Sequence, residues 1–342
     1  MNADASAATG VVAVLIQPAL RPQLLSVVVP AYNEAQVLYD LHQRLSNCLM
    51  ALGLPYEIIY VDDGSTDQTA SIVKQLRLDD PCTGLIKLSR NFGKELALSA
   101  GLQKARGDCV VVIDADLQDP PELIGAMVNA WSEGADVVNM RRRHRAGETW
   151  LKKFSAHTFY RVLNRLSDVP IPEDVGDFRL LSRRAVDALN ALPERSRYMK
   201  GLFAWVGFHQ MTITYDRHAR AAGGAKQNYS KLWTLAIEGI TSFSVTPLRA
   251  ASLMGLVSAG TAFAMTFFYI LKTVVLGDTV RGFPTLIVAV LMLGGLQLMS
   301  IGILGEYLGR MFMETKRRPL FLIDEEILPG AAKVEPLRRR AD

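Results

Sequence analysis

Two carboxylates one residue apart follow a run of consecutive strand-forming residues at positions 110–113. They are Asp114 and Asp116, and Pro120 and Pro121 then prevent the strand from continuing. In open α/β sheets, ligands bind at the carboxyl ends of the strands, where these two side chains would lie. Carboxylates together with substrate phosphates are the usual ligands of Mg²⁺ or Mn²⁺. The spacing therefore indicates a divalent-metal site, and a capped strand-to-helix turn is the alternative.

A second acidic pair, Asp62 and Asp63, ends another apolar stretch at residues 56–61. These carboxylates could accept hydrogen bonds from a base N–H or a ribose hydroxyl, and the alternative is a capped β-turn through Gly64. Carboxylates repel a bare diphosphate, so a diphosphate at this place requires a cation between them. The chain has neither the glycine-rich dinucleotide fingerprint nor the P-loop pattern, which removes both as leading interpretations.

The elements that must position these carboxylates alternate along the chain. Strand-like stretches occur at residues 25–30, 56–61, 84–88, 110–113 and 135–140, with helical periodicity at 35–52 and 95–105 among them. Such alternation predicts an α/β fold with a doubly wound, mostly parallel sheet. Because the carboxyl ends of parallel strands meet on one side of a sheet, the acidic loops are expected to converge there.

Charge is distributed unevenly over the 342 residues. Charged residues make up 21% of the chain and apolar residues 49%, but charges nearly vanish between about 250 and 305. The net charge is +4, and the basic residues cluster near the apolar segments, which favours a membrane surface over nucleic acid as a partner. The cysteines, Cys48, Cys82 and Cys109, have no metal-ligand spacing and fit a reducing compartment.

Several motifs in this order resemble family 2 glycosyltransferases of the GT-A fold. They are SVVVPAYNE at residues 26–34, VDDGSTD at 61–67 and DADLQDPPE at 114–122. LSRNFGKE at 88–95 and GDFRLL at 176–181 are similar to the subgroup that transfers sugars to polyprenyl phosphates, which includes dolichol-phosphate mannose synthases and bactoprenol glucosyltransferases. The resemblance extends over about residues 24–320 and implies a metal-dependent glycosyltransferase with a sugar-nucleotide donor.

The resemblance also implies roles for individual residues. The sugar nucleotide would be bound by Pro30, Tyr32, Glu34, Asp62, Lys94 and Asp114. The metal, Mg²⁺ or Mn²⁺, would be held by Asp114, Asp116 and Gln118. A metal on the leaving diphosphate neutralises the charge that grows as the C1–O bond breaks. For Lys94, solvation on a helix surface is the alternative.

Basic residues after the fifth strand-like stretch could capture the phosphate of a lipid acceptor. The candidates are Arg141, Arg179, Arg217, Arg220 and Lys226, although the arginines at 141–145 could equally form a solvated loop. Asp177 could orient Arg179 or act as a base, and Asp116, Asp177 and Arg179 are the candidate catalytic residues. A phosphate monoester has a second pKa of about 6 and is already largely a dianion at neutral pH. It needs little base catalysis, so we expect Asp177→Asn to be less damaging than Asp116→Asn.

Three segments point to a membrane. Residues 150–166 have a basic, aromatic-bearing amphipathic pattern typical of an interfacial helix, with a core helix as the alternative. Two apolar runs, about 250–276 and 283–305, are each long enough to cross a bilayer, and a buried helical pair is the alternative. Basic residues flank the outer ends of this hairpin, which places both termini and the catalytic domain in the cytoplasm by the positive-inside rule.

These observations predict the domain organisation. We expect a flexible N-terminal tail (1–23), a cytoplasmic GT-A catalytic domain with interfacial helices (24–245), two transmembrane helices (246–308), and a juxtamembrane segment with a basic C-terminal tail (309–342). The tail is expected to be loose from Glu325 onward.

The expected activity is the inverting transfer of a hexose, with glucose from UDP-glucose favoured, to undecaprenyl phosphate at a bacterial inner membrane for cell-envelope glycosylation. Inversion and a homo-oligomer, plausibly a tetramer, rest on the resemblance alone. Alternative donors are GDP-mannose, UDP-N-acetylglucosamine and an aminoarabinose-type sugar nucleotide. A polysaccharide synthase is disfavoured because its usual Q-x-x-R-W motif is absent. A non-catalytic membrane-tethered binding protein fits poorly because both the D-x-D and arginine motifs are present.

Overall fold

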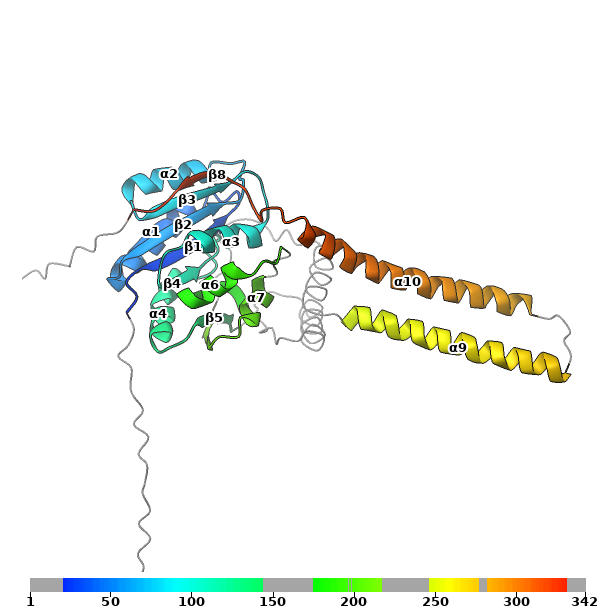
Figure 1. The fold of residues 1–342 in the computed structure, drawn as a ribbon. Coiled ribbons are helices and arrows are strands. Elements are labelled where there is room, and N and C mark those ends of the chain that lie inside the picture. The colour runs from blue at the N-terminus through cyan, green and yellow to red at the C-terminus, as the bar shows by residue number, and fades with distance from the viewer. Residues whose placement is uncertain are drawn as a thin grey trace, which may run out of the picture.

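The protein is described by a computed structural model that covers residues 21–143, 175–195, 197, 199–216, 246–276 and 282–330. Within these residues, one eight-stranded sheet carries helices on both faces, and two long helices lie side by side and project away from it (Figure 1). The predicted α/β class is therefore confirmed.

The elements include the five predicted strands and the two predicted helices, with ends that differ by up to three residues. In chain order they are β1 (Leu25–Ala31), α1 (Leu38–Leu52), β2 (Tyr56–Asp62), α2 (Thr69–Asp79), β3 (Thr83–Leu88), α3 (Lys94–Lys104), β4 (Cys109–Val112), the 3₁₀ helix η1 (Pro121–Leu123), α4 (Ile124–Ser132), β5 (Val137–Arg142), β6 (Val175–Ser182), α6 (Arg183–Ala191), α7 (Met199–Trp205), β7 (Gln210–Tyr215), α9 (Thr246–Leu276), α10 (Phe283–Thr315) and β8 (Ile323–Ile327).

The sheet is mixed, with the strand order β7-β5-β6-β4-β1-β2-β3-β8. Strands β3, β2, β1 and β4 are parallel to one another, and β5 is parallel to β7. Strand β6 runs antiparallel between β4 and β5, and β8 runs antiparallel to β3. The ends of β1, β2, β3, β4, β5 and β7 and the beginnings of β6 and β8 therefore lie on one side of the sheet, called the carboxyl rim below.

The central strands are buried on both faces, which explains their uninterrupted apolar runs. Successive side chains of a strand point to opposite faces. In β1, Val27 and Val29 pack in the cluster that includes α1, α2 and α4, whereas Val28 packs in the cluster that includes α3, α6 and α7. Both layers of helices therefore support the same strands, and they hold the rim from two sides.

The chain returns to the sheet after α10 and ends its described part as β8, so the expectation of a loose tail from Glu325 is wrong as far as Gly330. The acidic side chains of β8 form ion pairs with lysines of α2, β3 and α3. These pairs are Glu325–Lys74 at 2.7 Å, Asp324–Lys87 at 3.0 Å and Glu326–Lys104 at 2.8 Å. The pairing lysines lie far away in sequence, so the strand could not be recognised from its own residues.

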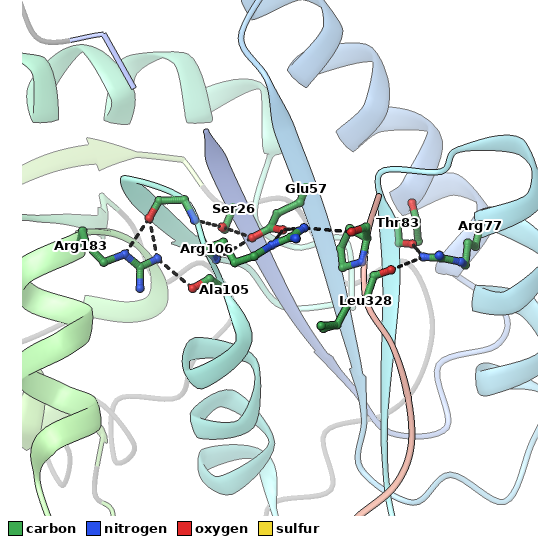
Figure 2. Close-up of polar contacts among 10 residues, drawn as sticks. Ser26, Glu57, Arg77, Thr83, Ala105, Arg106, Arg183 and Leu328 are labelled. Atoms are coloured by element: carbon green, nitrogen blue, oxygen red, sulfur yellow. Dashed lines mark hydrogen bonds and ion pairs between the residues drawn. The ribbon is translucent and has the colours of Figure 1, made fainter. Parts of the chain in front are cut away.

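Two arginines hold the segment that follows β8 (Figure 2). Arg77 donates hydrogen bonds of 2.7 Å to the carbonyls of Thr83 and Leu328. Arg106 donates to the carbonyl of Pro329 at 2.9 Å and to the buried carboxylate of Glu57 at 2.7 Å. The chain therefore contributes strands to the sheet both before α9 and after α10.

The helices α9 and α10 correspond to the two predicted apolar spans, and α10 continues past residue 305 to Thr315. They pack against each other as a hairpin. In the described part of the chain, no helix is long and apolar enough to cross a membrane. The predicted crossing of a bilayer therefore stays a prediction.

Candidate functional site

A pocket of about 370 Å³ opens at the carboxyl rim, between the ends of β1, β2 and β4 and the beginning of α3. Its lining includes the predicted residues Pro30, Tyr32, Glu34, Lys94, Asp114 and Asp116. They come from three separate segments, at the end of β1, at the beginning of α3 after β3, and after β4, which the parallel order of β3, β2, β1 and β4 brings together. Most of the predicted donor-binding residues therefore share one cavity, as the convergence of the strand ends implied.

Lys94 lies between two carboxylates at the centre of this charged region. Its Nζ is 2.6 Å from Oδ1 of Asp114 and also contacts Asp177, which the antiparallel strand β6 brings to the rim. Burial alone would lower the pKa of Lys94, but the two carboxylates together raise it above its usual range. Burial also raises the pKa of Asp114, assisted by the neighbouring Asp177 and opposed by Lys94. One ammonium thus serves two carboxylates.

Asp63, rather than the predicted Asp62, contributes to the pocket lining. The Asp63 carboxylate accepts hydrogen bonds from the backbone N–H groups of Phe92 and Gly93, at 2.7 and 2.9 Å. Burial raises the pKa of Asp63 in spite of these two donors. Asp63 therefore fastens the end of β2 to the loop that leads into Lys94, a role that the sequence analysis missed.

Asp62 lies next to this site but is buried, with only 1% of its surface exposed. Its Oδ1 accepts a hydrogen bond of 3.0 Å from the backbone N–H of Ser65, and its Oδ2 has no hydrogen-bond partner among the described residues. Neighbouring residues at a strand end point to different sides, so an Asp-Asp pair alone does not indicate which one faces the pocket.

The loop after β1 is fastened to the loop after β2 by Asn33. Its backbone N–H donates to Ser65 Oγ at 2.9 Å, and its side-chain oxygen accepts from the backbone N–H of Thr66 at 2.9 Å. Asn33 has a left-handed backbone with φ of 55°, which asparagine tolerates better than most residues. The residues on either side of it, Tyr32 and Glu34, both line the pocket.

Comparison with known proteins agrees with the motifs around this pocket. Residues 26–189 match the family model described as Glycosyl transferase family 2. The chain is 44% identical over 299 residues to the prophage bactoprenol glucosyl transferase homolog of Escherichia coli (strain K12), covering 87% of this chain and 98% of that protein. The chain belongs to glycosyl transferase family 2. It is an enzyme of the glycosyltransferase class.

Other relatives of this glycosyltransferase extend over most of its length. It is 49% identical over 301 residues to an uncharacterized glycosyltransferase of Synechocystis sp., covering 88% of this chain and 95% of that protein. It is 44% identical over 302 residues to the bactoprenol glucosyl transferase of Shigella phage SfV, covering 88% of this chain and 98% of that protein. The subgroup resemblance seen in the motifs is therefore confirmed.

Solved structures are more distant from this glycosyltransferase. A glucosyl-3-phosphoglycerate synthase from Mycobacterium tuberculosis, crystallised with Mn²⁺, UDP-glucose and phosphoglyceric acid, has a TM-score of 0.46 at 22% identity. The matched region covers 64% of this chain and 78% of the synthase chain.

The carboxylates of the glycosyltransferase pocket have the chemistry that a hard divalent cation requires. Asp114 and Asp116 both line it, and Asp116 Oδ1 accepts a hydrogen bond of 3.2 Å from the backbone N–H of Gln118. Gln118, the third predicted ligand, does not line the pocket. Within the described ranges, no group of three or more His, Cys, Asp or Glu side chains converges as a metal site. Mg²⁺ commonly binds through one or two carboxylates plus substrate phosphates, so the donor set fits a metal that the nucleotide helps to hold.

Arg179, a predicted phosphate ligand and catalytic residue, is buried below the rim and does not line the pocket. Its guanidinium donates to the carbonyl of Gly176 at 2.7 Å and stacks 3.8 Å from the ring centroid of Phe203. Burial lowers the pKa of Arg179 to about 10, against the effects of Asp177 and Glu95. In this conformation Arg179 supports the beginning of β6, and its contact with phosphate stays a prediction.

The remaining acceptor candidates are only partly described. Arg141 is exposed near the end of β5, and because β5 runs parallel to β4 it lies at the carboxyl rim. Arg217, Arg220, Lys226 and the expected interfacial helix at 150–166 lie outside the described residues.

Proposed function

We propose that this glycosyltransferase moves a hexose, with glucose from UDP-glucose favoured, to undecaprenyl phosphate with inversion at a bacterial inner membrane. The observation that carries the proposal is the rim pocket, which combines Asp114 and Asp116 with Lys94 beside Tyr32 and Glu34. Such a set suits a nucleoside diphosphate sugar held through a divalent cation. The names of the bactoprenol glucosyl transferase relatives support glucose and a polyprenyl phosphate.

On the donor side, Tyr32 and Glu34 would contact the base and ribose, and Asp114 and Asp116 would hold Mg²⁺ or Mn²⁺. A bound metal supplies charge neutralisation for the departing diphosphate. Lys94 adds a second positive charge at the same place, where negative charge develops as the C1–O bond breaks. The Lys94 ammonium lies 2.6 Å from Asp114 Oδ1, so the second positive charge and a proposed metal ligand share one place in the pocket.

On the acceptor side, the lipid phosphate is a dianion near neutral pH and can attack C1 directly. Direct in-line attack inverts the anomeric configuration. Asp177 is engaged by Lys94, which favours a positioning role for its carboxylate over that of a general base. Arg141, at the end of β5, would attract the acceptor phosphate to the same side of the sheet.

The hairpin of α9 and α10 would bring this site to the lipid. Many of its large apolar side chains are exposed, including Leu256 (71%), Phe263 (78%) and Leu298 (72%). Contiguous apolar surface of this kind marks a membrane or protein contact. We place the hairpin in the bilayer and the catalytic domain on the cytoplasmic side, with Lys316, Arg317 and Arg318 at the lipid headgroups. Contact between copies in a homo-oligomer would cover part of the same surface.

The decisive experiment incubates the full chain, purified in lipid nanodiscs, with undecaprenyl phosphate and Mg²⁺ or Mn²⁺. Separate reactions contain labelled UDP-glucose, GDP-mannose, UDP-N-acetylglucosamine or an aminoarabinose nucleotide. Label that becomes extractable into organic solvent from UDP-glucose alone would support the proposal, and its loss in Asp116→Asn would link it to the pocket. Extractable label from another donor only would replace the sugar, whereas none from any donor would refute the acceptor class.

A further inference from the structure

A buried hydrogen bond lies directly behind the carboxylate loop of the pocket. Tyr215, the last residue of β7, donates its hydroxyl proton to Oδ1 of Asp119. Asp119 is fully buried and Tyr215 is 5% exposed, so water competes little for this bond. The ring of Tyr215 also packs edge-on against Phe178, with centroids 6.0 Å apart and planes at 80°. The hydroxyl is therefore held in place by the packing of its own ring.

Asp119 ends a loop whose backbone is unusual. Between Asp116 and Asp119, Leu117 has a φ of 57°, in the left-handed region that residues with a side chain seldom occupy. Its side chain is buried in the core, and the next N–H, that of Gln118, turns back to the carboxylate of Asp116. A backbone in a sparsely populated region persists only where its surroundings fix it.

The two ends of this loop are fixed by different parts of the sheet. At its beginning, Asp114 follows β4 in the centre of the sheet and pairs with Lys94. At its end, Asp119 is held by Tyr215 from β7, the strand at the far edge. Asp116 lies between these two anchors and, like Asp114, lines the pocket. A shift of Asp119 would therefore be passed to Asp116 through only two residues.

We propose that Tyr215 is a positioning residue of the donor site. Its hydroxyl holds Asp119 and thereby the left-handed turn that presents the Asp116 carboxylate to the metal and diphosphate of the donor. The proposal rests on the proposed function for the identity of the substrate, but not for the geometry of the loop. The simpler alternative is that the bond only stabilises the fold, in which case its removal would leave donor binding unchanged.

Tyr215→Phe separates the two roles because it keeps the ring and its contact with Phe178 and removes only the hydroxyl. Tyr56→Phe is the matched control: Tyr56 donates to Asp80 at 3.4 Å from the first residue of β2, at the opposite end of the sheet from the rim. The full chain and both variants are compared in kcat and KM for UDP-glucose. Binding of UDP with Mn²⁺ by calorimetry and amide hydrogen exchange over residues 114–119 complete the comparison.

We expect Tyr215→Phe to lower kcat/KM for UDP-glucose about tenfold, the effect of losing one buried hydrogen bond, to weaken UDP–Mn²⁺ binding and to speed exchange at Gln118. Tyr56→Phe should stay within about twofold of the parent in all three measurements. Asp119→Asn keeps an oxygen that accepts from Tyr215 and should retain more donor binding than Asp119→Ala. Tyr215→Phe should lower donor binding less in the Asp119→Ala background than in the parent, because the bond between the two side chains is then already absent.

Unchanged exchange over 114–119 together with unchanged UDP–Mn²⁺ binding in Tyr215→Phe would overturn the proposal. The hydrogen-exchange measurement needs neither the sugar nor the lipid acceptor. If no donor is turned over, the proposed function fails, while faster exchange at Gln118 in Tyr215→Phe but not in Tyr56→Phe still supports the role of Tyr215. If the parent turns over UDP-glucose but Tyr215→Phe changes neither the exchange over 114–119 nor UDP–Mn²⁺ binding, the positioning role fails and the proposed function stands.

Discussion

Lys94 Nζ lies 2.6 Å from Oδ1 of Asp114, so the first carboxylate of the D-x-D motif is already ion-paired inside the pocket. Because Asp177 contacts the same ammonium, Lys94 compensates two carboxylates that would otherwise repel each other in a partly buried place. A metal that approaches Asp114 meets a group whose charge is partly neutralised. Asp116 lines the same pocket, and its Oδ1 accepts a hydrogen bond of 3.2 Å from the backbone N–H of Gln118.

The first prediction follows from this pairing. Replacing Lys94 with methionine leaves Asp114 and Asp177 without their shared cation and removes one positive charge from the leaving diphosphate. We expect kcat/KM for the donor to fall about 10²- to 10³-fold, measured with labelled UDP-glucose. Lys104→Met is the control, because Lys104 lies on the same helix but pairs with Glu326 at 2.8 Å. Equal activity in the two variants would contradict the role given to Lys94.

The second prediction ranks two carboxylates. Asp177→Asn keeps an oxygen toward Lys94, and the phosphate acceptor needs no strong base, so we expect a loss in kcat of about tenfold or less. Asp116→Asn removes a charged ligand of the metal and should cost about 10²-fold or more. Steady-state rates with undecaprenyl phosphate compare them, with circular dichroism to verify folding. Complete and equal loss of activity in the two well-folded variants would contradict the ranking.

The elements that could be predicted are those that neighbouring residues in the sequence indicate by themselves. Consecutive apolar residues at 110–112 marked a strand buried on both faces, and the carboxylates after it indicated the rim. The reversed direction of β6, which brings Asp177 to Lys94, depends on pairing between strands that are distant in sequence. The same is true of β8, whose acidic residues resembled a solvated tail until their lysine partners were known. Long-range pairing, rather than residue type, decided what the sequence left open.

The third prediction concerns pH and His42. Burial lowers the pKa of His42 below its ordinary value of 6.5, although Asp80 and Asp79 oppose the shift. The folded state therefore prefers the neutral imidazole, which lies 3.2 Å from the hydroxyl of Tyr60. As the pH falls below 6.5, the unfolded chain binds the proton more readily than the folded one, so the free energy of unfolding decreases.

His42→Gln should flatten this decrease when urea denaturation is followed between about pH 5 and 8, the range in which histidine changes charge. His209→Gln, at an exposed histidine, is the control and should follow the parent curve. A His42→Gln variant whose stability decreases more steeply than that of the parent on acidification would contradict the sign of the effect.

The fourth prediction tests the docking of the segment after β8. A Cβ added at Gly84 would lie 2.5 Å from Cδ of Pro329, closer than side chains tolerate. Gly84→Ala should therefore loosen residues 327–330 and lower the free energy of unfolding by about 1–3 kcal/mol. Hydrogen exchange at β8 and thermal unfolding measure the two effects.

Pro329→Gly, which removes the clashing ring, should partly restore Gly84→Ala when the two are combined. The loosening should also reach residues 89–93, the loop that leads into Lys94. The carbonyl of Leu322, just before β8, accepts a 2.9 Å hydrogen bond from the N–H of Ser89 in this loop. Exchange that is unchanged at both β8 and residues 89–93 in Gly84→Ala would show that this edge is not coupled to the donor site.

The last prediction addresses the place of the hairpin. If α9 and α10 lie in lipid, an arginine at position 263 must enter hydrocarbon, which costs about 2–4 kcal/mol near the bilayer centre. Phe263→Arg should then lower the fraction of protein that stays with membranes after an alkaline wash. Leu78→Arg is the control, since Leu78 is equally exposed (83% against 78%) but lies on α2 of the catalytic domain. Equal retention of both variants would instead place Phe263 in water or against protein, and the acceptor would have to reach the rim without the hairpin.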